Sequence, residues 1–479
     1  MIYDSFITAK TGEEIPLFIS KRPMNSKYNP SLEAENFAQN QKNGFFVIGG
    51  IGNGMHIKAL LKQFPSSFIL AIEADRESLS YCLNFKDTKE CSTNPSVRFI
   101  TPDDIEEAVL KNYFPISYNN FTFTSLRSWQ NENPALTEKI NEEVHRALKK
   151  ISGDFSVQSH FGKIWQHNII VNFKNAVSWN YQADKEEALI CAAGPGLEKA
   201  IDYIKEKKDS ASIIAADTAF STLLEEGIIA DIVLSSDAQK VSAEHFYNCP
   251  LKEKTGKEIL FILDLSTNPA IYKSLIQRGH KAVFYNGGHP LSLALTGKSL
   301  PLINAAGGTV TAACCDFAYK AGFKILTFAG ADFSYPQGKA YARGTYLDRQ
   351  YNSTAVRFST AETKYSSLMY RTELVKDNEN NNALTTEVMK NYRQAINEWA
   401  VNCGFKKESK RLSMDFNNNK ISCTEEKIDF IPEKLLEENK KIFFPMCAWL
   451  KKYNGDRTEE ELLKLALAYS LRYNQKYEN

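Results

Sequence analysis

Residues 189–239 alternate short apolar runs with amphipathic segments, and this alternation constrains the fold more than any other feature of the chain. The three apolar runs end, in chain order, at Gly194-Pro195-Gly196, at Asp217 and at Ser235-Ser236-Asp237. A segment of helical periodicity follows each of the first two runs. The order predicts a β-α-β-α-β unit with a parallel sheet, and such sheets bind ligands at the carboxyl ends of their strands.

The same alternation continues toward the C-terminus. Further apolar runs end at Asp264, at Gly287-Gly288-His289 and at Gly330-Ala331-Asp332, and Gly307-Gly308-Thr309 opens another helical segment. A glycine-rich turn that opens a helix presents backbone N–H groups to an anion, so the turns at 194–196 and 307–309 are candidate phosphate sites. The polar residues at these turns could instead have a purely structural role as helix caps. Thr309, Asp217, Asp237 and Asp332 are of the residue types that cap helix N-termini.

The composition excludes several classes of protein. The chain has 479 residues, of which 43% are hydrophobic and 24% charged, as expected for two or three globular domains. Its formal net charge of +1 argues against a dedicated nucleic-acid binder, and no apolar run is long enough to span a bilayer. The start of the sequence has no secretory leader and the nine cysteines have no zinc spacing, so we expect a cytoplasmic protein with reduced thiols and no bound metal.

The N-terminal part carries a second glycine-rich pattern. An apolar run at 45–49 leads into Gly50, Gly52 and Gly54, and the next run ends at Glu73. An acidic residue about twenty positions after such glycines contacts ribose in a Rossmann unit. The segment resembles the cofactor-binding start of S-adenosylmethionine methyltransferases, but the alternation degrades after Pro115 and no catalytic methyltransferase motif follows. We therefore favour a Rossmann-like domain that has lost its ligand over an active cofactor site.

The central region, about 155–430, resembles the 6-hydroxymethylpterin diphosphokinase MptE-like domain of archaeal pterin enzymes and bacterial motility accessory factors. The resemblance is carried by the 194–197 turn, by Gly227-Ile228-Ile229-Ala230-Asp231, by Ser236-Asp237-Ala238-Gln239, by Gly307-Gly308-Thr309 and by Gly330-Ala331-Asp332. Gly196 stands where the family has serine, and Ala230 where it has proline. Tyr341 stands where the family has histidine.

The resemblance implies a transferase of the motility accessory factor type, which moves a nonulosonic, sialic-acid-like sugar from a CMP-linked donor to a protein hydroxyl, with flagellin as the acceptor. The donor would be bound by Gly194, Pro195, Gly196, Asp217, Ser236, Asp237, Gln239, Gly307, Gly308, Thr309 and Asp332. Lys339 and Arg343 would bind a sugar carboxylate or phosphate, or else be solvated charges. Asp237, Tyr341 and His289 are the candidate catalytic residues, although tyrosine is a poor base at neutral pH.

Two other functions stay open at this stage. The same family name covers a pterin diphosphokinase, which would use ATP and magnesium. The second alternative is a flagellin-binding scaffold without catalytic activity. Gly196 and Tyr341, which differ from the family's serine and histidine, favour this alternative. The transferase itself requires no cofactor, although a carboxylate beside a diphosphate could hold magnesium.

We expect an α/β protein with two Rossmann-like domains, at 1–154 and 155–431, and a C-terminal helical segment at 432–479. The 334–369 segment is long, irregular and rich in tyrosine and arginine, which is typical of a lid over an active site. An Asn-rich turn near residue 380 predicts a hairpin.

Overall fold

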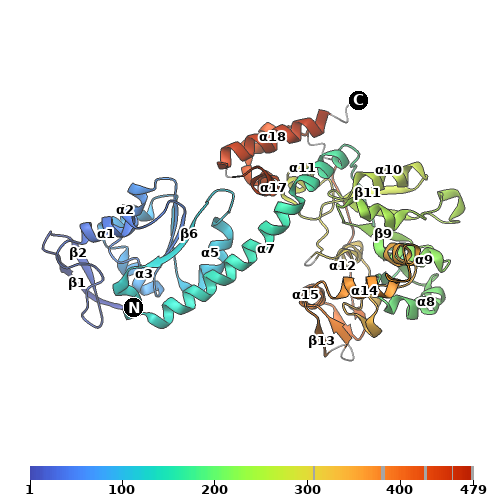
Figure 1. The fold of residues 1–479 in the computed structure, drawn as a ribbon, viewed down its shortest axis with the longest axis horizontal. Helices are drawn as coiled ribbons and strands as arrows, with labels where there is room; N and C mark the ends of the chain where they lie inside the picture. Colours follow the sequence, from blue (N-terminus) through green and yellow to red (C-terminus); the bar gives the residue numbers. More distant parts are fainter. Residues whose placement is uncertain (306–307, 379–382, 426–428, 456, 476–479) are drawn as a thin grey trace. The chain divides into compact units, whose positions relative to one another are not determined.

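A computed structural model of the chain describes residues 1–305, 308–378, 383–425, 429–455 and 457–475. The chain forms two compact units, one of residues 1–160 with 447–463 and one of residues 161–446 with 464–479. Figure 1 shows the elements of both. Each unit contains its own parallel sheet and helices, so the α/β fold class is confirmed. The three-domain division at residues 154 and 431 stays a prediction.

The first unit is built on a four-stranded parallel sheet. Its order is β5-β4-β3-β6, with bounds Val97–Ile100, Phe68–Ile72, Phe45–Gly49 and Phe121–Ser125. All of β3 is buried, as expected for a parallel strand covered on both faces. The hairpin β1 (Tyr3–Thr8) and β2 (Glu14–Phe18) precedes it, and the helices are α1 (Pro30–Gln39), α2 (Met55–Gln63), α3 (Arg76–Cys82), α4 (Lys86–Ser92), α5 (Ile105–Asn112) and α6 (Arg127–Glu132).

Helix α7 (Pro134–Phe173) is a single helix of 40 residues. The sequence analysis expected no regular pattern after Pro115, so the first half of this helix was missed. Its C-terminal half is anchored in the second unit by two asparagines. The Nδ2 of Asn168 donates to the carbonyls of Ala238 and Ser266, and that of Asn172 to those of Leu265 and Thr267. The helix therefore fixes the loops that follow β9 and β10.

The second unit contains an eight-stranded sheet of order β11-β10-β9-β8-β7-β12-β16-β15. The six strands from β11 to β12 are parallel, with bounds Lys281–Tyr285, Leu260–Asp264, Ile232–Ser235, Ser212–Ala216, Glu187–Cys191 and Ile325–Ala329. The short strands β16 (Arg411–Ser413) and β15 (Lys406–Glu408) continue it antiparallel. The predicted alternation of strands and helices is confirmed.

The strand order contains a topological switch point. From β7 the chain proceeds outward through β8, β9 and β10 to β11, and then returns to place β12 on the other side of β7. Open α/β sheets bind ligands in the crevice at such a point, outside the carboxyl ends of the strands. A ligand site is therefore expected in the crevice between β7 and β12.

Figure 1 also shows the helices that follow residue 195. They are α8 (Gly196–Lys207), α9 (Asp217–Glu225), α10 (Pro269–Gln277), α11 (Pro290–Thr296), α12 (Val310–Ala321), α15 (Glu387–Asn402), α16 (Pro432–Glu438), α17 (Phe444–Asn454) and α18 (Glu459–Gln475). The 334–369 segment is less irregular than expected, since it contains α13 (Tyr346–Ser353) and α14 (Ala361–Met369). The strands of the predicted hairpin are β13 (Val375–Asp377) and β14 (Ala383–Thr385), which pair antiparallel; its Asn-rich turn at 379–382 lies outside the described residues.

Within the described residues, none of the helices combines the length and the apolar character that crossing a bilayer demands.

Candidate functional site

A cleft of about 290 Å³ lies at the switch point. Its floor is formed by the residues that follow β7 and β12, namely 192–194 and 330–334. Its walls are Ala216 and Thr218 after β8, Val310 and Thr311 at the start of α12, Tyr335, Ala340 and Tyr341, Leu368 of α14, and Met389 and Tyr392 of α15. The cleft thus combines strand ends, a helix N-terminus and several aromatic side chains.

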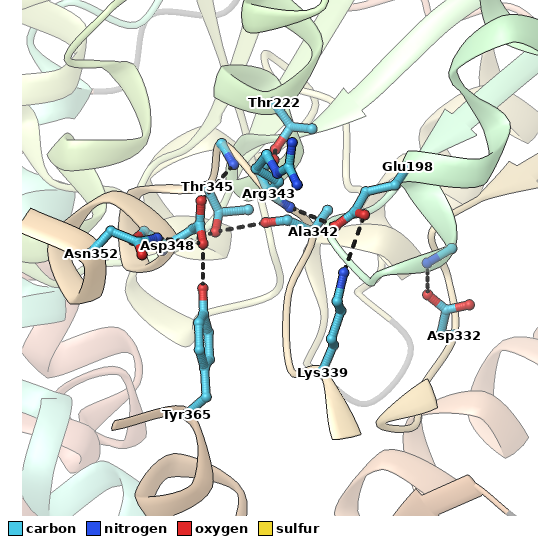
Figure 2. A network of polar contacts seen from close by, with 12 residues as sticks. Glu198, Thr222, Asp332, Lys339, Ala342, Arg343, Thr345, Asp348, Asn352 and Tyr365 are labelled. Carbon is cyan, nitrogen blue, oxygen red and sulfur yellow. Dashed lines mark hydrogen bonds and ion pairs between the residues drawn. The ribbon is translucent and has the colours of Figure 1, made fainter. Parts of the chain in front are cut away.

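The 194–196 turn does not face this cleft with free N–H groups. The Gly196 N–H donates to Asp332 Oδ2 over 2.7 Å, and the Gly194 N–H donates to the Gly330 carbonyl. The next two N–H groups, of Leu197 and Glu198, bond to carbonyls within the same turn. The carboxylate of Asp332 therefore occupies the position that a phosphate was expected to take at this turn (Figure 2).

The second glycine-opened helix presents its N-terminus to the cleft. Thr309 caps α12, because its Oγ1 accepts from the Ala312 N–H. This is the structural role that the sequence allowed for Thr309. Gly308 has a φ of +103°, a conformation that favours glycine. The first two residues of the helix, Val310 and Thr311, line the cleft. Gly307 lies outside the described residues.

The aromatic side chains of the cleft are poor proton acceptors. Burial raises the pKa of Tyr341 to about 12 and also raises the pKa of Tyr335. Tyr341 thus stays protonated at neutral pH and cannot replace the family histidine as a base. Together with Phe333 and Tyr392, these rings instead give the cleft flat apolar surfaces.

Residues 339–345, called the strap from here on, cross from the cleft to α13. Glu198 of α8 holds the strap, because its carboxylate accepts from the Arg343 N–H at 2.9 Å and pairs with the Lys339 ammonium at 3.4 Å (Figure 2). Thr222 Oγ1 donates to the Arg343 carbonyl, and Ser221 Oγ to the Gly344 carbonyl. The first part of the predicted lid is therefore fastened to α8 and α9.

A second cavity of about 510 Å³ lies on the other side of the strap. It shares Ala340 and Tyr341 with the cleft, so Tyr341 borders both. Its polar lining includes Arg343, whose side chain is exposed, and Asp348, which accepts from Tyr365 OH and from the Gly344 N–H. Figure 2 shows these groups together.

The remaining predicted residues lie at the strand ends beyond the cleft. Asp217 is buried and accepts from Thr218 and from Ser235 Oγ. Asp237 Oδ1 accepts from the Gln239 N–H, and the Ser236 hydroxyl contacts Tyr285. His289 caps α11 through Nδ1, and burial lowers its pKa to about 4. His289 is not among the residues that line the cleft, so its role as a base stays a prediction.

One strand-end residue was passed over as a site residue. Asp264, at the end of β10, is 4% exposed, and its carboxylate lies against the backbone of Ser266 and Gly287. Burial raises the pKa of this carboxyl to about 6, although the Ser266 N–H bonds to Oδ1. The sequence feature that could have identified Asp264 is an apolar strand that ends in a single acidic residue.

The raised pKa of Asp264 makes stability depend on pH. Folding favours the protonated form, so its contribution is complete below about pH 4 and is lost as the pH rises through about 6. We expect Asp264→Asn, which removes the ionisation, to gain about 2 kcal/mol relative to wild type as the pH rises from 4.5 to 7.5. Urea denaturation at the two pH values measures this gain, and a constant difference would contradict the assignment.

The glycine turn of the first unit is filled by its own side chains. Glu73 is fully buried and accepts from the Ile51 N–H, from Tyr3 OH and from Trp129 Nε1. A Cβ on Gly50 would lie 2.5 Å from the indole of Trp129. The carboxylate expected to contact ribose is therefore engaged inside the unit, in agreement with the reading that a ligand was lost.

Within the described ranges, no three His, Cys, Asp or Glu side chains gather closely enough to hold a metal ion.

Comparison with known proteins adds the following. A family model described as 6-hydroxymethylpterin diphosphokinase MptE-like matches residues 163–338. An uncharacterized protein of Treponema pallidum (strain Nichols) is 35% identical over 156 residues, which are 32% of this chain and 74% of that protein. A second one is 35% identical over 143 residues, which are 29% of this chain and 51% of that protein.

One solved structure resembles the whole chain. The MAf glycosyltransferase of Magnetospirillum magneticum AMB-1 aligns over 99% of this chain and 87% of its own, with a TM-score of 0.53 and 14% identity. At this identity the likeness concerns the fold.

Proposed function

Because the chain belongs to the MptE-like family of motility accessory factors, we propose that it is a glycosyltransferase that moves a nonulosonic sugar from a CMP-linked donor to a protein hydroxyl. Flagellin is the proposed acceptor. The observation that carries the proposal is the cleft at the β7–β12 switch point, where flat aromatic side chains and the N-terminus of α12 line one cavity.

The cleft suits a nucleotide in two respects. Tyr335, Tyr341 and Tyr392 line it, and aromatic rings stack on any nucleobase. The first turn of α12 carries the partial positive charge of a helix N-terminus, which stabilises a phosphate. We therefore place the donor phosphate at Val310 and Thr311.

This placement changes the role of the 194–196 turn. Since Asp332 already accepts from Gly196, a phosphate there would have to displace a carboxylate. The turn instead brings β7 and β12 close together and so forms the floor of the cleft.

The acceptor is proposed to approach from the second cavity, across Tyr341. In the transfer, the acceptor oxygen bonds to the anomeric carbon as the bond from that carbon to phosphate breaks, and CMP leaves with the electron pair. Negative charge grows on the phosphate in this step, so a helix N-terminus fixed beside it lowers the barrier. Lys339 and Arg343 are the nearby cations proposed to attract the sugar carboxylate; Lys339 would first have to leave Glu198.

We expect CMP to raise the melting temperature, because a ligand that binds only the native state stabilises it by about 2.7 kcal/mol at 100 times its Kd. Tyr392→Ala removes one stacking surface and should weaken CMP binding about tenfold or more, since base stacking contributes about 1–3 kcal/mol. Thermal shift and calorimetry measure both effects.

Tyr203→Ala is the matched control, because Tyr203 is a partly exposed tyrosine on α8 that does not line the cleft. Its CMP affinity should equal that of wild type. Stabilisation by ATP with 6-hydroxymethylpterin, but not by CMP, would favour a pterin diphosphokinase. A protein that responds to none of these ligands would be better explained as a scaffold.

A further inference from the structure

A buried histidine that the sequence analysis did not single out lies next to the cleft. His245 belongs to the short 3-10 helix Lys240–Phe246 and is 6% exposed. Its Nε2 lies 3.5 Å from Thr218 Oγ1, at the outer limit of a hydrogen bond, and its Nδ1 has no partner among the described residues. A buried ring nitrogen without a hydrogen bond lowers the stability of the fold. Such a group in a native structure calls for an explanation other than packing.

Thr218 connects this histidine to the cleft. It lines the cavity, and its Oγ1 lies 3.1 Å from Asp217 Oδ1 as well as beside His245. Asp217 is itself held in place, because Ser235 Oγ donates to its other oxygen over 2.7 Å. The hydroxyl of this lining residue thus donates to a fixed carboxylate and also lies beside an imidazole.

An aromatic ring and three acidic residues lie near His245. Tyr346 of α13 packs edge-on against the imidazole, with ring centroids 4.6 Å apart. The acids near this pair are Asp217 from α9, Asp237 after β9 and Glu244 beside His245, and all three raise the pKa of Tyr346 after burial, its largest cause.

We propose that His245, acting through Thr218, takes up the proton that the acceptor loses. The inference rests on the proposed glycosyl transfer. As the acceptor oxygen bonds to the anomeric carbon and CMP leaves, the acceptor proton passes to Thr218 Oγ1 and the hydroxyl proton of Thr218 passes to His245 Nε2. Thr218 touches the acceptor, and His245 is a positioning residue with its other proton on Nδ1. This arrangement supplies the base that Tyr341 cannot be.

The test is the pH dependence of CMP release from CMP-N-acetylneuraminic acid, with water as the acceptor. We expect the wild-type rate to rise between about pH 5 and 8, where imidazole is the side chain that changes charge. His245→Gln and Thr218→Val should lose this rise and lower kcat about 100-fold, with KM unchanged. Thr218→Ser keeps the hydroxyl and should keep the profile.

His280→Gln is the matched control for burial. His280 is 3% exposed, bonds through Nε2 to the Pro250 carbonyl at 2.7 Å and also has an unpartnered Nδ1, but it precedes β11 at the opposite end of the strand. This variant should lose stability without a change in the pH profile.

Two outcomes overturn the relay. A His245→Gln enzyme that releases CMP with the wild-type pH profile has no need of the imidazole, and equal losses in His245→Gln and His280→Gln indicate a structural role. If CMP binds normally in either case, the proposed function survives. If the wild type neither binds CMP nor releases it, the proposed function and the relay fail together.

Discussion

Gly194→Ala is expected to lower the free energy of unfolding of the second unit by about 3 kcal/mol or more. A Cβ at this position would lie 2.5 Å from the Gly330 carbonyl oxygen and 2.4 Å from Asp332 Oδ2. The first of these atoms belongs to the backbone after β12 and cannot swing aside, so β7 and β12 must separate. Urea denaturation measures the loss.

Two further variants separate the causes. Asp332→Ala removes the carboxylate that a Cβ at position 194 would meet, but the Gly330 carbonyl stays in place. The double variant Gly194→Ala, Asp332→Ala should therefore still be less stable than Asp332→Ala alone. Gly153→Ala is the control for the substitution itself, because a Cβ there meets nothing within 4 Å inside α7, and alanine favours a helix by about 1 kcal/mol. Wild-type stability of Gly194→Ala would contradict the close packing at the switch point.

Trp129→Ala should destabilise the first unit by about 3–5 kcal/mol. The indole is fully buried against the 49–50 turn, and its N–H donates to Glu73 over 3.0 Å. Its removal leaves a cavity and takes one hydrogen bond from a buried carboxylate. Chemical denaturation measures the change in the unfolding free energy.

Trp129→Phe separates the contribution of packing from that of the hydrogen bond. It keeps an aromatic ring but removes the N–H, and we expect it to lower the free energy of unfolding by about 1–3 kcal/mol. The same filling of the turn predicts that the wild type does not bind S-adenosylmethionine. Calorimetry that finds micromolar affinity, about −8 kcal/mol, would show that the site is open after all and would bring methyl transfer back into consideration.

The parts of the fold set by local pattern were predictable. Apolar runs that end in glycine or acid marked the six parallel strands of the second unit. The first half of α7 was missed although Ile140, Val144 and Ala147 are buried at helical spacing. The polar residues between them obscured that signal.

The parts set by long-range contacts were not predictable. Asp332 meets Gly196 across 136 residues, and Trp129 meets Glu73 across 56. No local spacing indicates either pair, and both occupy turns that local pattern assigned to ligands. The strand order was not predictable either. The alternation of strands and helices predicts that β12 exists, but it does not indicate that β12 pairs with the free edge of β7.

The most direct test of the central claim is a crystal structure with CMP bound. The account predicts the phosphate at the Val310 and Thr311 N–H groups and the cytosine against Tyr335, Tyr341 or Tyr392, with Asp332 still bonded to Gly196. CMP at the 194–196 turn with Asp332 displaced, or at the 50–54 turn of the first unit, would contradict it.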